Sequence, residues 1–499
     1  MLAVILLILF LLMKELNMKN EVSENYISDY DNEIKEIANY TVNFSKFSDL
    51  SRETAYYVLL DSIACGILAL KNESCKNLLG PVFGGSNIDN GARVFGTNFK
   101  LDPIRAAWNT GCIIRWLDFN DTWLAEEWGH PSDNLGAILP LTDYLSLQWV
   151  KEGRKPIKIS ELLDHTIKAH EIQGILALDN SFNKVGLDHV LLVRIASSAL
   201  SSYLLGGDYQ DVCNTLSHAW IDGSSLRTYR HAPNTGSRKS WAAGDATSRA
   251  VHLAWLTTRG EEGYKGALSA KTWGFSDVSF KSELIKRSQD YGCYVMENIL
   301  FKISFPAEFH AQTAVEAGIS LHKIYKDRLD KISQIEVETQ ESAVRIISKT
   351  GPLHNYADRD HCLQYMIAIA LIYGKVEASH YQDEIASNPM IDVLREKMII
   401  RENPNFSKDY LDPNKRSIAN SVTLIFDDGS KSEKITVEYP VGHRNRREEG
   451  TPLLIKKFEN AISSYYSNNQ SDDILSSFLD KEKFLNLSVN KMMDKLIIK

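Results

Sequence analysis

The chain has 499 residues, of which 44% are hydrophobic and 24% are charged, and its formal net charge is −8. This length exceeds what one hydrophobic core usually organises, so the sequence predicts two or more globular domains. The negative charge argues against a nucleic-acid binder, and an anionic ligand would have to meet a local cluster of cationic side chains.

The amino terminus is an apolar extension, which we assign to residues 1–17. Leu2–Met13 is a continuous apolar run of 12 residues, too short to span a bilayer easily. A signal peptide would place a basic residue before the run and small residues after it, whereas Lys14 and Glu15 follow here. The pattern favours Met18 as the true start of the protein and predicts no stable membrane association. A membrane-tethering or export segment is the alternative.

The six cysteines lie far apart in the sequence, and no two of them form a Cys-x-x-Cys pair. This spacing argues against a zinc site and against an iron–sulfur cluster held by thiolates. We expect buried free thiols. Glycine-rich nucleotide motifs are missing as well, so the sequence predicts neither a metal nor another cofactor.

Residues 18–304 are predicted to form the first part of a helical domain. Apolar residues recur at steps of three and four within Leu187–Leu205 and Asp133–Leu147, as on an amphipathic helix, and Pro140 should kink the second of these. Ala242–Leu256 is rich in alanine, and such small side chains suit close packing between helices.

The pattern changes near residue 305, where we place an α+β lid domain that extends to residue 443. Ile335–Thr339 alternates apolar and polar residues, as a half-exposed strand does. Ser421–Phe426 and Lys434–Tyr439 are also typical strands, and Asp427-Asp428-Gly429 between them predicts a hairpin.

Residues 444–499 are predicted to return to the helical domain. Four apolar side chains should share one side of the first helix: Leu453, Leu454, Phe458 and Ile462. The polar stretch Ser467–Asp473 is interpreted as an exposed loop. The predicted fold is therefore mainly α with a smaller α+β lid domain.

The most informative segment is Trp116–Trp123, which continues to Gly129–Asn134. It places two carboxylates, Asp118 and Asp121, and the hydroxyl of Thr122 among large apolar side chains, as a half-buried pocket requires. On a helix the two aspartates would share a face. Backbone capping by these aspartates is an equally good interpretation of the spacing alone.

Two histidines precede predicted helix starts. His130 stands before Pro131, and His189 lies in the first turn of the predicted helix Leu187–Leu205. Free N–H groups and the helix dipole favour an anion at such a position, for example a substrate carboxylate. The alternative is a pair of partly buried structural histidines.

The stretch from residue 227 to residue 239 forms an irregular basic loop. Its cationic and potentially cationic residues are Arg227, Arg230, His231, Arg238 and Lys239. In an acidic protein this concentration favours a local anion-binding site, and a solvated basic surface is the alternative.

Lys302 and His310 lie near the predicted junction of the two domains, where clefts often form. Arg359, His361 and Tyr365 follow in the lid, and Tyr365 is expected one helical turn beyond His361 on the same helix. Arg359 could instead form a salt bridge with a neighbouring aspartate.

Several long runs resemble the MmgE/PrpD family from about residue 30 to the end of the chain. They are Leu117–Trp123 with Gly129–Asn134, Lys168–Gly174, Ser224–Gly236 and Phe301–His310. The resemblance implies a large helical domain, a smaller lid domain, an active site between them and a homodimer. It also implies a cytoplasmic enzyme, or one in the mitochondrial matrix of a eukaryote.

The activity implied by the resemblance is the dehydration of 2-methylcitrate to 2-methyl-cis-aconitate in the methylcitrate cycle of propionate breakdown, without an iron–sulfur cluster. Dehydration of citrate or decarboxylation of cis-aconitate are alternative activities within the family. A helical protein that binds a tricarboxylate without turning it over is an alternative of another class.

The resemblance to cis-aconitate decarboxylase, a related enzyme, also implies site residues. We expect catalytic roles for Asp118, His130, His189, Lys239, Lys302, His310 and Tyr365. We expect substrate contacts from Thr122, Arg227, Arg230, His231, Arg238, Arg359 and His361. The base would be Asp118, His130 or His189, and the acid Tyr365 or His310, while cations stabilise the developing negative charge.

Overall fold

The structure is a computed structural model that describes residues 7–8, 13, 27–84, 87–222, 225–231 and 234–498. Apart from residues 7, 8 and 13, the predicted extension 1–17 lies outside the described residues. Ser224, Ala232 and Pro233 of the family-like run also lie outside them. Within the described ranges, no helix combines the length and the apolar character needed to cross a membrane.

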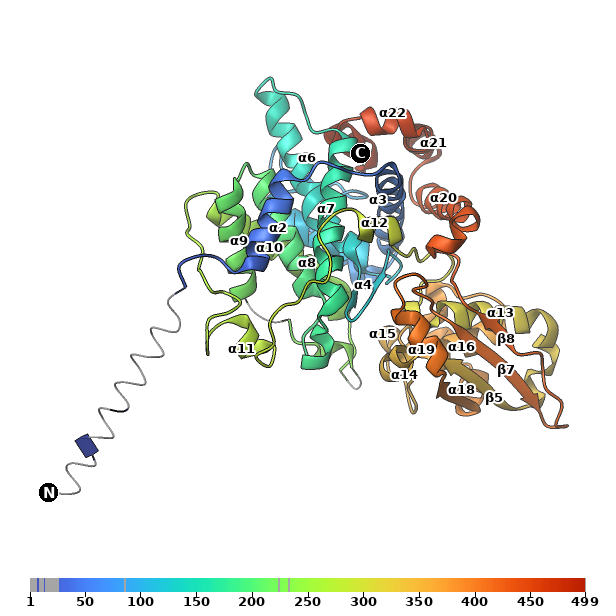
Figure 1. Cartoon of the computed structure of the whole chain (residues 1–499). Helices are drawn as coiled ribbons and strands as arrows, with labels where there is room; N and C mark the ends of the chain where they lie inside the picture. Colours follow the sequence, from blue (N-terminus) through green and yellow to red (C-terminus); the bar gives the residue numbers. More distant parts are fainter. Residues whose placement is uncertain are drawn as a thin grey trace.

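A large helical domain and a smaller domain built on a sheet lie side by side (Figure 1). The large domain holds α2 (Asn32–Asn43), α3 (Asp49–Ala69), α4 (Glu73–Lys76), α5 (Pro103–Arg115), α6 (Leu135–Lys151), α7 (Ile159–Asp179), α8 (Val190–Leu204), α9 (Tyr209–Ile221), α10 (Arg238–Thr257), α11 (Phe275–Ser279) and α12 (Tyr294–Asn298). The helices predicted over Leu187–Leu205, Asp133–Leu147 and Ala242–Leu256 are confirmed as α8, α6 with the short 3-10 turn before it, and α10.

Small residues bring the central helices close together. A Cβ atom on Gly244 of α10 would lie 2.3 Å from the carbonyl oxygen of Trp108 on α5, and one on Gly136 of α6 would lie 2.7 Å from the Cα of Gly111 on α5. These distances are too short for any larger side chain. Glycine therefore sets the spacing of α5, α6 and α10.

The small domain has a four-stranded sheet with the order β6-β5-β7-β8. β5 (Ile332–Thr339) pairs in parallel with β6 (Met398–Glu402) and antiparallel with β7 (Asn420–Phe426), which pairs antiparallel with β8 (Ile435–Val437). The predicted strands and the hairpin are confirmed, and Gly429 supplies its positive φ of 79°. The helices are α13 (Gln312–Tyr325), α14 (Glu341–Ile347), α15 (Tyr356–Arg359), α16 (Leu363–Tyr373), α17 (Asp383–Ala386), α18 (Pro389–Glu396) and α19 (Pro404–Leu411).

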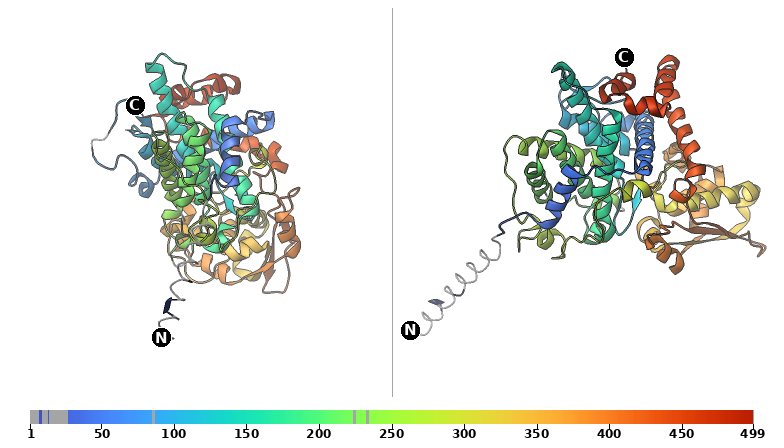
Figure 2. Two further views of the ribbon diagram at one scale, coloured as in Figure 1. Left: turned by 60° about the vertical axis from the view of Figure 1, so that its left-hand side comes forward. Right: turned by 45° about the horizontal axis from the view of Figure 1, so that its top comes forward.

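The carboxy-terminal helices pack on the large domain, as predicted (Figure 2). They are α20 (Arg447–Ser463), α21 (Asn468–Phe478), α22 (Lys481–Asn486) and α23 (Val489–Leu496). Two details of the prediction were wrong. Leu453 is 44% exposed, because it lies about 100° around the helix from the buried Leu454. The polar stretch Ser467–Asp473 caps and begins α21, whose buried face is Ser471, Ile474 and Phe478.

Each domain has its own hydrophobic core, and the chain crosses between them in two adjacent segments. Phe301 donates its N–H to the carbonyl oxygen of Gly442 at 3.0 Å, so the outgoing and returning segments are paired. A Cβ on Gly442 would overlap the carbonyl of Phe301, at 1.7 Å. This pairing holds Lys302 at the junction of the two domains.

Candidate functional site

The loop after α5 carries Asp118 in a left-handed conformation, with φ at 51°. The expectation that Asp118 and Asp121 share a helix face was wrong, because α5 ends at Arg115 and the chain turns there. Asp118 faces Lys302, whereas Asp121 contacts Nε2 of His170 at 2.8 Å. The turn thus directs the first carboxylate toward the small domain and keeps the second inside the large one.

The carboxylate of Asp118 is the centre of a buried ionic cluster. Oδ1 lies 2.5 Å from Nη1 of Arg115, 2.6 Å from Nζ of Lys302 and 3.5 Å from Nε2 of His130. Oδ2 lies 3.8 Å from Nε2 of His361. Burial alone would raise the pKa of Asp118, but the charges of Arg115 and Lys302 outweigh it and hold that pKa well below its usual range. Asp118 is therefore ionised.

His130 presents one ring nitrogen to this carboxylate. Its Nδ1 lies 2.6 Å from the carbonyl oxygen of Asp121 and 3.3 Å from Oγ1 of Thr122, and the residue caps the 3-10 turn Pro131–Asn134 as predicted. A carbonyl oxygen only accepts, so Nδ1 carries the proton and Nε2 offers its lone pair toward Asp118. Burial, with the positive charges nearby, lowers the pKa of His130 well below its usual value, so the ring is neutral.

Lys239, in the first turn of α10, connects the domains. Its Nζ lies 2.7 Å from each carboxylate oxygen of Asp360 and 3.2 Å from Nδ1 of His361. Asp360 Oδ1 in turn lies 2.7 Å from that same Nδ1. Burial lowers the pKa of Lys239, which makes the contact with Asp360 important for keeping the ammonium charged.

A second ionic group forms around Asp188, just before α8. Arg230 holds its carboxylate with Nη2 at 3.1 Å from Oδ1, and Nη1 of Arg227 lies 3.7 Å from Oδ2. The same Nη2 lies 3.5 Å from Nε2 of His189, whose ring centre is 5.7 Å from that of His130. The two predicted helix-start histidines therefore lie together, and they join the Asp188 group to the Asp118 cluster.

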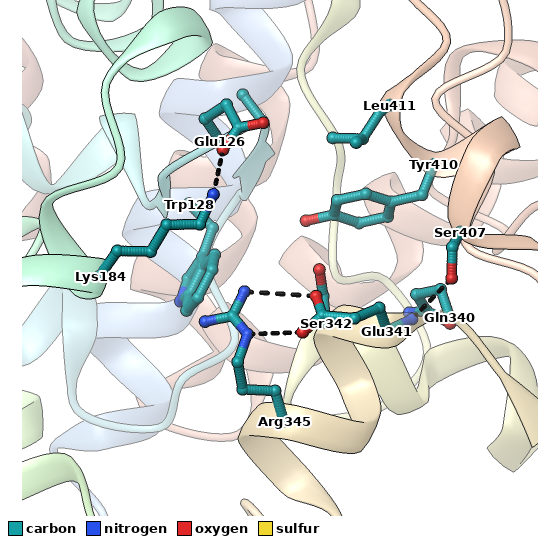
Figure 3. A pocket seen from close by; sticks show the side chains of 11 residues that line it. Glu126, Trp128, Lys184, Gln340, Glu341, Ser342, Arg345, Ser407, Tyr410 and Leu411 are labelled. Atoms are coloured by element: carbon teal, nitrogen blue, oxygen red, sulfur yellow. Dashed lines mark hydrogen bonds and ion pairs between the residues drawn. The ribbon is translucent and has the colours of Figure 1, made fainter. Parts of the chain in front are cut away.

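His310 lies at the edge of the cluster, behind a pocket between the domains. Its Nδ1 is 2.7 Å from Oε1 of Glu308, and its Nε2 is 3.1 Å from the hydroxyl of Tyr410. Tyr410 and Trp128 line the pocket, which has a volume of about 370 Å³. Figure 3 shows these two aromatic side chains facing each other from the two domains, with Arg345 below them.

The sequence matches known families over most of its length. The model of the MmgE/PrpD N-terminal domain matches residues 35–288, and that of the MmgE/PrpD C-terminal domain matches residues 305–481. The chain belongs to the MmgE/PrpD family. It is 52% identical over 95% of its length to a 2-methylcitrate dehydratase of Salmonella typhimurium, of which the match covers 99%. It is 51% identical over 93% of its length to one of Cupriavidus necator, with 97% covered, and 51% identical over 96% to a mitochondrial one of Yarrowia lipolytica, with 92% covered.

Some residues expected at the site lie elsewhere in this MmgE/PrpD structure. The hydroxyl of Tyr365 donates to the carbonyl oxygen of His380 at 2.7 Å inside the core of the small domain. The expectation that it shares a helix with His361 was wrong, because α15 ends at Arg359 and α16 begins at Leu363. The break turns the two side chains in different directions.

Three of the expected cationic residues are also outside the cluster. Arg359 donates to the carbonyl oxygen of Tyr381 at 2.7 Å and forms an ion pair with Asp383, so it pairs with neither Asp358 nor Asp360. The exposed Arg238 stacks on Trp241, with its guanidinium carbon 4.4 Å from the ring centre. His231 is exposed on the basic loop.

Three charged members of the clusters were not expected from the sequence: Arg115, Asp188 and Asp360. Asp188 and Asp360 are adjacent in the sequence to predicted site residues, and Arg115 lies three positions before one. Local pairing with Asp118, His189 and His361 was the available signal.

Of the six free cysteines, only Cys293 is partly exposed. Among the described residues, no group of three or more His, Cys, Asp or Glu side chains is arranged to hold a metal ion.

Proposed function

We propose that this MmgE/PrpD protein catalyses the dehydration of 2-methylcitrate to 2-methyl-cis-aconitate, as a hydro-lyase of propionate breakdown. The curated relatives that carry the name 2-methylcitrate dehydratase support the substrate. The observation that carries the proposal is the buried cluster around Asp118, where lysine, arginine and neutral histidine side chains from both domains converge.

The charge balance of the two clusters suits a substrate with three carboxylates. Five cations face three carboxylates: Arg115, Arg227, Arg230, Lys239 and Lys302 against Asp118, Asp188 and Asp360. Removing a proton next to a carboxylate creates a dianion that water stabilises poorly. Cations fixed in place before the reaction stabilise it without reorganisation, an effect worth about 3–4 kcal/mol for one donor.

The proton transfers can be assigned to groups around Asp118. A neutral imidazole, His130 or His361, takes the proton from carbon, and the electron pair forms the double bond as the C–O bond breaks. The leaving hydroxide takes a proton from the ammonium of Lys302 and departs as water. Burial lowers the pKa of Lys302, which makes its ammonium a stronger acid. Tyr365, bound to a carbonyl oxygen, is left out of this scheme.

The substrate must enter by separation of the domains, because Asp118, Lys239 and Lys302 are each at most 2% exposed. The pocket at Trp128 and Tyr410 lies directly in front of His310, so we place the route of entry there. Closure would then exclude water and strengthen the ionic contacts.

The test is turnover by purified protein after treatment with a chelator, followed by the absorbance of the conjugated alkene. We expect turnover of 2-methylcitrate. Preferential turnover of citrate, or release of carbon dioxide from cis-aconitate, would favour a sister activity, and binding without turnover would favour the binding protein. Lys239→Ala and His130→Ala should lose activity while folded. Arg249→Ala is the control, because Arg249 is a partly exposed residue of α10 paired with Asp222.

We also propose a homodimer, which light scattering at several protein concentrations tests. Large exposed apolar side chains support it, among them Ile221 at 52% and Trp255 at 42% on α9 and α10.

We propose the cytoplasm as the compartment, or the mitochondrial matrix in a eukaryotic source, as the name of the Yarrowia lipolytica relative indicates for that protein. Cell fractionation with an antibody tests the compartment.

A further inference from the structure

Asp360 and His361 form a carboxylate–imidazole pair that faces the centre of the cluster. We propose that Asp360 is a positioning residue that makes His361, among the histidines of the cluster, the acceptor of the proton from carbon. The inference rests on the proposed dehydration and names its base. His361 was expected only to contact substrate, and Asp360 was not expected at the site.

The contacts fix the tautomer of His361. Its Nδ1 lies 2.7 Å from Oδ1 of Asp360, and an ionised carboxylate only accepts hydrogen bonds, so Nδ1 carries the proton. Nζ of Lys239, 3.2 Å from Nδ1, is also a donor, and it is satisfied by both oxygens of Asp360. The lone pair is therefore on Nε2, which points toward Oδ2 of Asp118 at 3.8 Å.

The position of Asp360 is itself fixed by its neighbours. Its carbonyl oxygen accepts from the backbone N–H of Glu308 at 3.2 Å, in the segment that connects the domains. Lys239 of α10 holds its carboxylate from the other domain. The contact between Lys239 and this pair forms only when the two domains are together, which links the position of Asp360 to closure.

The other histidines are less suited to accept the proton. His130 donates to a neutral carbonyl oxygen, and His361 to a carboxylate, which stabilises the imidazolium far better. Nε2 of His189 faces the guanidinium of Arg230 at 3.5 Å. Nε2 of His310 faces the hydroxyl of Tyr410, and His310 pairs with Glu308 rather than with Asp118.

The step balances within the cluster. The C–H bond breaks, its proton goes to Nε2 of His361 and its electron pair forms the double bond. The C–O bond breaks, and the hydroxide takes a proton from Lys302 and leaves as water. Asp118 contacts Lys302 at 2.6 Å and lies 3.8 Å from His361, so the proton on the imidazolium can return to the lysine across it.

Asp360→Asn tests the role of the carboxylate. The ammonium of Lys239 should donate to the amide oxygen, so that the amide N–H₂ donates to Nδ1 of His361. The proton of the neutral imidazole must then lie on Nε2. We expect kcat to fall by about 10³ to 10⁴, as for a catalytic histidine held in the wrong tautomer, with KM changed only a few-fold. Asp360→Glu should recover part of the rate. Asp358→Asn is the matched control, since Asp358 is a buried carboxylate two residues away that pairs with Lys349.

A pH profile adds a readout that a structural role would not move. The charged groups that act on His361 are Asp360 in its own segment, Lys239 on α10, Asp118 after α5 and Glu308 in the connecting segment. Burial, then Lys239, lowers the pKa of His361, while Asp360 raises it. Losing Asp360 should therefore move the acidic limb of kcat/KM to lower pH.

The ¹⁵N shifts of His361, assigned by comparison with His361→Gln, give a test that is read on the wild-type protein itself. A protonated Nδ1 supports the proposal, and a protonated Nε2 overturns it. Wild-type kcat in Asp360→Asn, or an equal loss in Asp358→Asn, also overturns it. Failure of the wild type to dehydrate 2-methylcitrate while His361 shows a protonated Nδ1 would instead count against the proposed substrate.

Discussion

Nζ of Lys302 contacts Asp118 twice, at 2.6 Å from Oδ1 and 2.9 Å from the carbonyl oxygen of the same residue. The lysine comes from the segment that connects the domains, and the aspartate from the strained loop after α5. This contact fixes the central carboxylate of the cluster and places an ammonium where the leaving hydroxide would take its proton.

Lys302→Met removes that ammonium and keeps most of the side-chain volume. We expect kcat for dehydration to fall by at least about 10², because a preorganised cation and the acid are lost together. Arg115 still compensates Asp118, so the fold should persist. The measurement is alkene absorbance beside circular dichroism and thermal unfolding. A folded variant with near-wild-type kcat would exclude Lys302 as the acid.

Tyr365→Phe separates the structural position of this residue from its expected catalytic role. Since its hydroxyl donates to the carbonyl oxygen of His380, we expect kcat to change less than about threefold. The free energy of unfolding should fall by about 1 kcal/mol, the usual worth of one buried hydrogen bond. Activity assays and denaturant titration give both values. A large loss of kcat at unchanged stability would return Tyr365 to the list of catalytic residues.

Sequence patterns located three helices of the large domain and three strands of the sheet, but they did not predict β6 or the individual helices of the small domain. Helix α8 and strand β5 follow from apolar periodicity, because that periodicity records which face is buried, whereas α10 follows from its alanine content. Ser467–Asp473 misled because most of its polar residues, apart from the buried Ser471, lie on the solvent face of α21, where composition does not distinguish a helix from a loop. The break between His361 and Tyr365 has no glycine or proline to reveal it.

The candidate site was only partly predictable for a different reason. His130, Lys239 and Lys302 stand out because a cation or histidine at a helix start or a domain junction is locally unusual. The side chain of Asp118 contacts Lys302, and does not share a helix face with Asp121, because the chain turns at Asp118 with a positive φ. No pattern in Trp116–Trp123 specified that turn. Arg238 shares the charge of the cluster residues but is exposed, whereas Arg359 is buried away from the cluster, beside Asp383. The tertiary fold decides both positions.

Glu127→Gln should alter how stability depends on pH. Glu127 is buried, and burial raises its pKa to about 7, although Arg227 opposes the shift. Between about pH 4.5 and pH 7 the folded chain then holds a proton that the unfolded chain has released. This contribution, about 3 kcal/mol, is present below pH 4.5 and is lost as the pH rises through 7.

The variant lacks this titration, so its thermal midpoint relative to the wild type should be higher at pH 8 than at pH 5. Thermal unfolding of both proteins across this range is the measurement. Asp133 and Glu171, whose pKa values burial also raises to about 7, titrate in both proteins and cancel in the difference. Parallel curves for the two proteins would show that Glu127 does not gain its proton in this range.

Arg345 of the pocket belongs to the small domain and also contacts the large one. Its Nη1 donates to Oδ1 of Asn183 in the large domain at 2.8 Å, and its guanidinium carbon lies 5.6 Å from the ring centre of Trp128. Figure 3 shows it extending from α14 toward that ring.

If substrate enters here, Arg345→Ala should raise KM several-fold and leave kcat within about threefold, because the residue attracts the anion and helps closure without reaching Asp118. The salt dependence of kcat/KM should weaken in parallel. Arg328→Ala is the matched control, since Arg328 is a similarly exposed arginine of the same domain that stacks on Phe426. Equal KM values in the two variants would place the entrance away from this pocket.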